Sequence, residues 1–115
     1  MALKTNPRRG QVVRVRLDSV EGSEQGGTRP ALVLSPSAYN GRVGLALLCP
    51  ITSQAKGYPF EVPLPEGSPV TGVVGADQVK SLDWRARKAA RIGAVPEEVV
   101  AEVVRRLQTL LGENG

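Results

Sequence analysis

Hydrophobic and polar residues alternate along the first part of the chain. In residues 11–17 every second residue is apolar and arginines lie between, a period of two that predicts a half-buried β-strand. Residues 31–35 form a short apolar run. Residues 43–51 form a nearly continuous one, as expected for a strand covered on both faces. These segments predict a sheet.

Two more segments extend this prediction. Residues 60–64 alternate again, and the prolines at 59, 63 and 65 indicate a strand at a sheet edge. Residues 70–79 predict one or two short strands, with Gly72 and Gly75 indicating a bend or bulge. An Asn-Gly pair within residues 37–42 predicts a hairpin turn.

The period changes near the end of the chain. From residue 97 to residue 111 apolar residues recur every three or four positions, which predicts an amphipathic helix that packs on the sheet. Two glutamates in its first turn and two arginines toward its end suit the helix dipole, and Gly112 is a candidate C-cap. The fold class is therefore mainly β with a C-terminal helix, a small curled antiparallel sheet or barrel in one domain over residues 1–115.

Composition narrows the chemistry. The chain has no histidine, which excludes imidazole proton shuttles and histidine-ligated metals. Its single cysteine excludes an internal disulfide and a cysteine zinc site. We find no signal peptide, and the longest apolar run is too short for a bilayer, so we expect a soluble, cytoplasmic protein with no membrane partner.

The charge indicates a polyanionic partner. The net charge is +4, with an excess of six positive charges in residues 1–96 and of two negative charges in residues 97–115. Aromatic residues are too scarce for a platform that stacks bases.

A glycine-bearing loop that ends in an arginine is the first candidate site. Gly26 and Gly27 allow close approach to another surface, and Pro30 biases Arg29 toward extended geometry at the mouth of a strand. A guanidinium is a planar donor fork suited to phosphate oxygens. The alternative is an ordinary salt bridge, for example to Glu24.

Two further segments could contact nucleic acid. Thr52, Ser53 and Gln54 end the buried strand and Lys56 follows, although polar residues at a strand end also form ordinary turns. Residues 77–91 carry five positive charges, which could line an RNA groove or form a solvated surface. The glycine fingerprints GxxxxGK[ST] and GxGxxG are absent.

These segments together resemble a known family. GSEQGGTRPALVLSP, PITSQAKGYPFEVPL and ADQVKSLDWRAR are similar to the signature segments of MazF/PemK-type toxins, the bacterial sequence-specific mRNA interferases. RRGQVVRVRLD resembles the opening strand of that family, and the similarity is strongest to its enterobacterial type. It extends over residues 8–111.

The resemblance implies an SH3-like β-barrel with a C-terminal helix that forms a homodimer. It implies cleavage of single-stranded RNA at short motifs without metal or other cofactor. Attack by the 2′-OH would leave a 2′,3′-cyclic phosphate and a 5′-OH. It also implies a type II toxin-antitoxin system, in which a MazE-type antitoxin lays an acidic disordered tail over the RNA groove.

The resemblance also assigns residues. The catalytic pair falls on Arg29 and Thr52, and Glu24 is a candidate general base. Lys56 and Lys80 are candidates for backbone phosphates. The candidates for base edges are Gln25, Ser53, Gln54 and Gln78.

Two other classes of function share the charge and the fold. One is a nucleic-acid-binding barrel without catalysis. The other is an interaction module such as a gyrase inhibitor, since fold alone does not fix function. The pair Arg29 and Thr52 distinguishes them, because a gyrase binder has no use for it.

Overall fold

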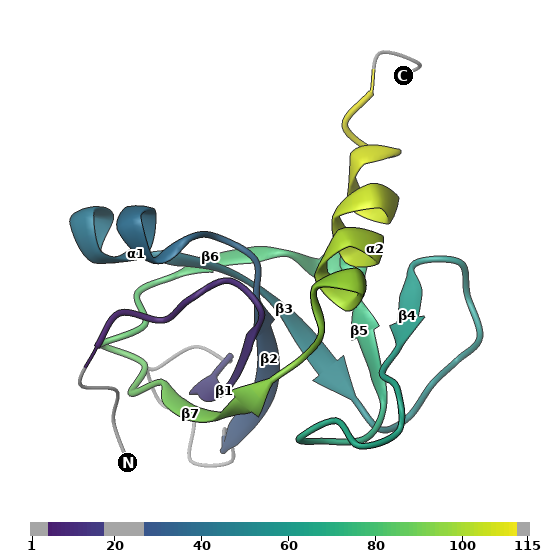
Figure 1. Ribbon diagram of the computed structural model, residues 1–115, viewed down its shortest axis with the longest axis horizontal. Helices are drawn as coiled ribbons and strands as arrows, with labels where there is room; N and C mark the ends of the chain where they lie inside the picture. The colour runs from purple at the N-terminus through teal and green to yellow at the C-terminus, as the bar shows by residue number, and fades with distance from the viewer. Residues whose placement is uncertain (1–4, 18–26, 113–115) are drawn as a thin grey trace.

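The computed structural model describes residues 5–17 and 27–112 (Figure 1). It contains seven strands, two α-helices and a 3₁₀ turn. The strands are β1 Gln11–Arg16, β2 Thr28–Val33, β3 Ala46–Thr52, β4 Glu61–Pro63, β5 Val73–Gly75, β6 Lys80–Leu82 and β7 Ala90–Ala94. The helices are α1 Ser37–Val43 and α2 Glu97–Gln108, and the 3₁₀ turn η1 spans Ala76–Gln78.

All seven strands join one antiparallel sheet, in the order β4-β5-β3-β2-β1-β7, with β6 paired to β3 beside this path. This confirms the predicted mainly antiparallel fold with a C-terminal helix. The strand of residues 60–64 lies at the sheet edge as predicted. Among the described strands no pairing joins β4 to β7, so hydrogen bonds do not close the sheet into a complete barrel.

Both faces of the sheet bury apolar side chains. On one face Ile51, Val62 and Val74 pack with the valines of α2, and Figure 1 shows this helix rising beside β4 and β5. On the other face Val13, Leu48 and their neighbours pack under the segment that carries Trp84 and Ala89. Successive residues of a strand point to opposite faces, so β1, β2 and β3 each supply both clusters.

The C-terminal helix ends earlier than predicted. Val99, Val100 and Val103 are buried, and glutamates and arginines occupy its first and last turns as expected. However, Thr109 is the C-cap rather than Gly112, and the Thr109 hydroxyl donates a hydrogen bond of 2.6 Å to the carbonyl oxygen of Arg106. The last turn is therefore capped before the glycine, and Leu110 and Leu111 are exposed.

The predicted hairpin turn is wrong, because residues 37–43 form the helix α1. The Asn40 side chain is fully buried, where it accepts a hydrogen bond from the Ser35 hydroxyl and donates to the carbonyl oxygens of Pro7 and Ser35. Its backbone oxygen accepts the indole N–H of Trp84 at 3.1 Å. These contacts hold Asn40 inward, and Gly44, with φ of 83°, ends the helix.

Two strands were not predicted, and one was predicted too buried. The sequence of residues 77–91 indicated an RNA groove or a solvated basic surface, but β6 forms within this segment and β7 begins in it and ends at Ala94. Residues 43–51 were expected to be covered on both faces. Instead Val43 lies in α1 and is 47% exposed, and Leu47 of β3 is 38% exposed.

We predict that Asn40→Ala destabilises the protein strongly. The substitution leaves buried carbonyl and hydroxyl groups without partners, so we expect a loss of about 3 kcal/mol in the free energy of unfolding. Urea denaturation measures it. Arg42→Ala, on the exposed side of α1, is the control and should change it by less than about 0.5 kcal/mol. Equal effects of the two substitutions would contradict this role of Asn40.

Candidate functional site

The register of β2 and β3 relates Arg29 to Thr52. The ladder pairs Ala31 with Pro50 and Leu32 with Cys49, and the same register continued by two residues places Arg29 opposite Thr52. Opposite residues of an antiparallel pair have Cα atoms about 4.5–5.5 Å apart and side chains on the same face. Both side chains are exposed. The two predicted catalytic residues thus lie at the same end of two neighbouring strands, two residues beyond the last paired positions Ala31 and Pro50.

This site lies on the sheet face opposite α2. The residues that pack against the helix are Ile51, Val62 and Val74. Their neighbours along the strands, Thr52, Glu61 and Val73, point the other way and line a pocket. The helix therefore stabilises the strands without occupying the face that carries the site.

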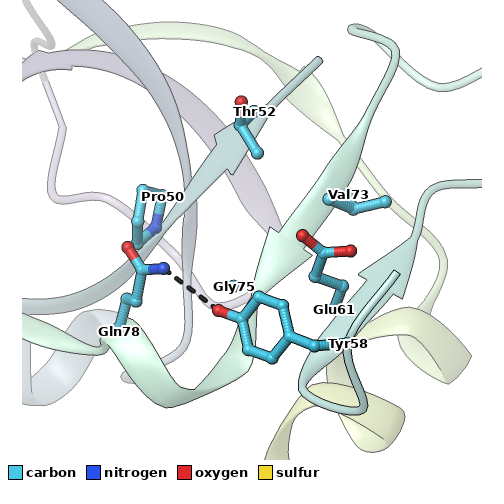
Figure 2. A pocket seen from close by; sticks show the side chains of 7 residues that line it. All are labelled: Pro50, Thr52, Tyr58, Glu61, Val73, Gly75 and Gln78. Atoms are coloured by element: carbon cyan, nitrogen blue, oxygen red, sulfur yellow. Dashed lines mark hydrogen bonds between the residues drawn. The ribbon is translucent and has the colours of Figure 1, made fainter. Parts of the chain in front are cut away.

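Two adjoining pockets surround Thr52. The smaller, of about 50 Å³, is lined by Pro50, Thr52, Tyr58, Glu61, Val73, Gly75 and Gln78 (Figure 2). The larger, of about 280 Å³, is lined by Thr52, Gln54, Lys56, Tyr58, Glu61 and Gln78. The structure therefore brings together four of the residues predicted from the sequence: Thr52, Gln54, Lys56 and Gln78.

The Thr52 hydroxyl is oriented by its own loop. Its oxygen accepts a hydrogen bond of 3.1 Å from the backbone N–H of Gln54. A hydroxyl that accepts in this way keeps its proton for another acceptor. Thr52 can therefore donate to an anion on the exposed rim.

A chain of hydrogen-bonded side chains, which was not predicted from the sequence, closes one side of the pocket. The Tyr58 hydroxyl donates to Asp77 Oδ1 at 3.0 Å. Figure 2 shows the second bond, in which Gln78 Nε2 donates to the Tyr58 oxygen at 3.2 Å. Because the Tyr58 proton goes to Asp77, the Gln78 amide group must be the donor to Tyr58. This fixes the Gln78 side chain and leaves its carbonyl oxygen and second N–H for a ligand.

Glu61 is a further residue whose role the sequence did not reveal, after Tyr58 and Asp77. Its carboxylate accepts hydrogen bonds from the backbone N–H groups of Lys56 and Gly57. The bond from Lys56 is the main cause that lowers the pKa of Glu61 below its usual value, and Gly57 adds to it. The only available signal was its polar position within the alternating segment 60–64.

The other described candidates, Arg29, Ser53 and Lys80, do not line these two pockets. Lys80 is exposed on β6 and pairs with Leu48, four residues along β3 from Thr52, or about 13 Å at the usual strand rise. Ser53 is exposed but lines neither pocket. Glu24 and Gln25 lie outside the described residues.

Within residues 5–17 and 27–112, no group of three His, Cys, Asp or Glu side chains could hold a metal ion. In the same part of the chain, no helix is long and apolar enough to cross a membrane.

Comparison with known proteins now identifies the family. The family of PemK-like, MazF-like toxins of type II toxin-antitoxin systems matches residues 8–111. The chain belongs to this family.

MazF-like relatives extend over nearly the whole chain. The endoribonuclease toxin MazF of Escherichia coli K12 is 47% identical over 106 residues, which cover 92% of this chain and 95% of the relative. The endoribonuclease PemK of Escherichia coli is 40% identical, and the match covers 94% of this chain and 84% of PemK.

Solved structures agree with the fold. A crystal structure of MazF from Deinococcus radiodurans has a TM-score of 0.86 and 53% identity, and the match covers 95% of this chain and 99% of that one. A MazE-MazF crystal structure from the same organism has a TM-score of 0.84 and 50% identity over 95% and 98% of the two chains.

A glycine packed against the backbone of Thr52 gives a prediction for this MazF-like site. Gly72 has φ of 131°, and a Cβ built there would lie 2.2 Å from the Thr52 carbonyl oxygen. Gly72→Ala must therefore displace the end of β3. We expect about a 100-fold loss in RNA cleavage, the activity for which the relatives are named, because small shifts of reacting groups are costly.

Gly67→Ala is the matched control. Gly67 lies in the same loop with φ of 89°, but nothing lies within 4 Å of its Cβ position. This variant shares the backbone strain without the clash, so it should lose about 1 kcal/mol of stability and keep its activity. If the two variants cleave RNA equally well, the packing of Gly72 on Thr52 does not position the site.

Proposed function

We propose that this protein is a sequence-specific, metal-independent endoribonuclease, an mRNA interferase that cleaves single-stranded RNA. The observation that carries the proposal is that Arg29 and Thr52 are both exposed at the same end of the neighbouring strands β2 and β3, in a chain whose relatives are named endoribonucleases. The guanidinium fork and the hydroxyl proton suit the oxygens of one phosphate.

The RNA itself supplies the nucleophile. A base removes the proton of the 2′-OH, and the 2′-oxygen forms a bond to the adjacent phosphorus. The bond from phosphorus to the 5′-oxygen then breaks, and this oxygen takes up a proton. The products are a 2′,3′-cyclic phosphate and a 5′-OH end, so atoms and charge balance without a metal or another reactant.

The roles follow from the donors available. Arg29 binds the equatorial oxygens of the phosphorane and is a candidate proton donor to the leaving oxygen, and Thr52 donates its hydroxyl proton to the same phosphate. Donors aimed at developing charge typically contribute about 100- to 1000-fold each. Arginine is a poor base because its pKa exceeds about 12. We therefore assign the general base to Glu24, a carboxylate of the preceding loop.

The remaining candidates bind the rest of the RNA. Lys56 and Lys80 contact backbone phosphates of different nucleotides, because Lys56 lines the larger pocket whereas Lys80 lies on β6 opposite Leu48. The base edges are contacted by Gln25, Ser53, Gln54 and Gln78. Gln78 presents a fixed amide to the pocket, which supports its role in sequence reading.

We further propose that the protein acts as the toxin of a type II system in the bacterial cytoplasm, where cutting mRNA halts translation. Its partners are a MazE-type antitoxin with an acidic disordered tail and a second copy of the chain in a homodimer. The MazE-MazF complex of Deinococcus radiodurans and the basic charge of residues 1–96 support this assignment.

The test is incubation of the purified protein with a long single-stranded RNA in EDTA, followed by mapping of both new ends. We expect cuts at one short motif that leave 5′-OH and 2′,3′-cyclic phosphate ends. Arg29→Ala should lower the cleavage rate by about 100- to 1000-fold. Arg29→Lys should remain at least about 10-fold impaired, because an ammonium lacks the planar fork.

Arg42→Ala is the matched control for charge, since Arg42 is exposed on α1. It should cleave like the unmodified protein. Binding of an oligonucleotide that lacks the attacking 2′-OH separates lost catalysis from lost affinity. Intact RNA, a requirement for metal, or full activity of Arg29→Lys would contradict the proposed mechanism.

A further inference from the structure

The Glu61 carboxylate is the only acidic group that lines the two pockets around Thr52 within the described residues. An anion beside the path of an RNA strand should weaken binding, by repulsion of the phosphates. The contacts of Glu61 indicate a favourable effect on RNA binding that would offset this repulsion.

All the described contacts of this carboxylate are with the backbone of the loop between β3 and β4. The N–H of Lys56 donates to both of its oxygens at 3.0 Å, and the N–H of Gly57 donates to Oε1 at 2.7 Å. These bonds to an ionised acceptor are stronger than neutral ones. Gly57 has φ of 83°, so the loop turns sharply at the point where the carboxylate holds it.

Glu61 is itself fixed from the other side of the sheet. Its backbone pairs with Gly75 of β5. Its carbonyl oxygen accepts a hydrogen bond of 2.9 Å from Arg106 Nη1, and the same nitrogen donates to the Pro59 carbonyl oxygen at 2.6 Å. Arg106 in turn contacts Glu102 within α2. The carboxylate therefore extends from a strand that is fixed by both the sheet and the helix.

The loop that Glu61 holds carries exposed side chains assigned above to RNA. Gln54 and Lys56 lie between Thr52 and the turn at Gly57, and all line or flank the larger pocket. Without an anchor, a segment of this kind would have to be ordered when RNA binds, at a cost in conformational entropy.

We infer that Glu61 is a positioning residue for RNA binding, which holds the backbone of the loop so that Lys56 and Gln54 face the RNA strand. This inference rests on the proposed function. Glu61 donates no group to the reaction. Its negative charge is compensated by the two backbone N–H groups of the loop. The gain in RNA affinity from holding the loop in place exceeds the loss from repulsion between the carboxylate and the phosphates.

Glu61→Gln tests this inference by the sign of its effect. The substitution removes a negative charge at nearly constant size. If Glu61 only repelled the RNA, binding would tighten, whereas a positioning role predicts weaker binding because one oxygen is replaced by an N–H donor. We expect about 3-fold weaker binding of an RNA oligonucleotide with a 2′-deoxy cleavage site, and about 10-fold for Glu61→Ala.

Two further measurements separate positioning from a general loss of structure. If Lys56 loses its phosphate contact, the slope of log K against log salt should fall by about 0.7 in Glu61→Ala. In a protein that already carries Lys56→Ala, Glu61→Ala should weaken RNA binding by less than about a further 3-fold, because the contact that Glu61 positions is already lost. For cleavage we expect KM to rise and kcat to stay within about 3-fold, since Arg29 and Thr52 remain in place.

Glu66→Gln is the matched control, because Glu66 is exposed in the loop after β4 and has no assigned contact with the RNA. It should bind RNA as tightly as the unmodified protein or slightly more tightly. Equal or tighter binding by Glu61→Gln, together with an unchanged salt slope in Glu61→Ala, would overturn the inference while the unmodified protein still cuts RNA. If the unmodified protein neither binds nor cuts RNA, the proposed function itself fails.

Discussion

The structure depends on the backbone hydrogen bonding of β3 to three other strands. One edge of Ala46–Thr52 pairs with β2, while the other edge pairs first with β6 and then with β5. These ladders determine where β3 ends relative to its neighbours. Because a register shift of one residue would turn every side chain to the opposite face, the sheet as a whole determines the face and the strand ends at which Thr52 and Arg29 lie.

The alternation along these strands separates stability from function. Ile51, Val62 and Val74 pack under α2, and the residues beside them on the same strands form the opposite face with its two pockets. The two faces remain linked through Arg106, which donates to the backbone of the segment that carries Glu61. The helix thus supports the site from behind.

Local patterns predicted the strands β1 to β5 and the presence of the C-terminal helix, because hydrophobic periods of two and of three to four residues can be read in the sequence itself. The predictions failed where distant contacts decide the structure. Residues 37–43 are helical because Asn40 is enclosed by Pro7, Ser35 and Trp84, and β6 forms because β3 offers it an edge. A local motif such as an Asn-Gly pair carries no information about contacts between residues that are distant in the sequence.

The same limit applies to the site. Motif resemblance found Thr52, Gln54, Lys56 and Gln78, which the fold gathers around one pocket. Resemblance missed Tyr58, Glu61 and Asp77, whose roles depend on hydrogen bonds across the sheet and the loop. Residues that contact a ligand can be recognised from a sequence motif. Residues that position those ligand-binding side chains are recognised only from their contacts in the structure.

The most direct test of the central claim is a crystal structure with a bound RNA oligonucleotide in which the attacking 2′-OH is replaced by hydrogen. We predict that one phosphate, at the cleavage position, lies within about 2.7–3.2 Å of both the Arg29 guanidinium and the Thr52 hydroxyl oxygen. A cleavage-site phosphate held away from either side chain would contradict the claim that the register of β2 and β3 builds the catalytic pair.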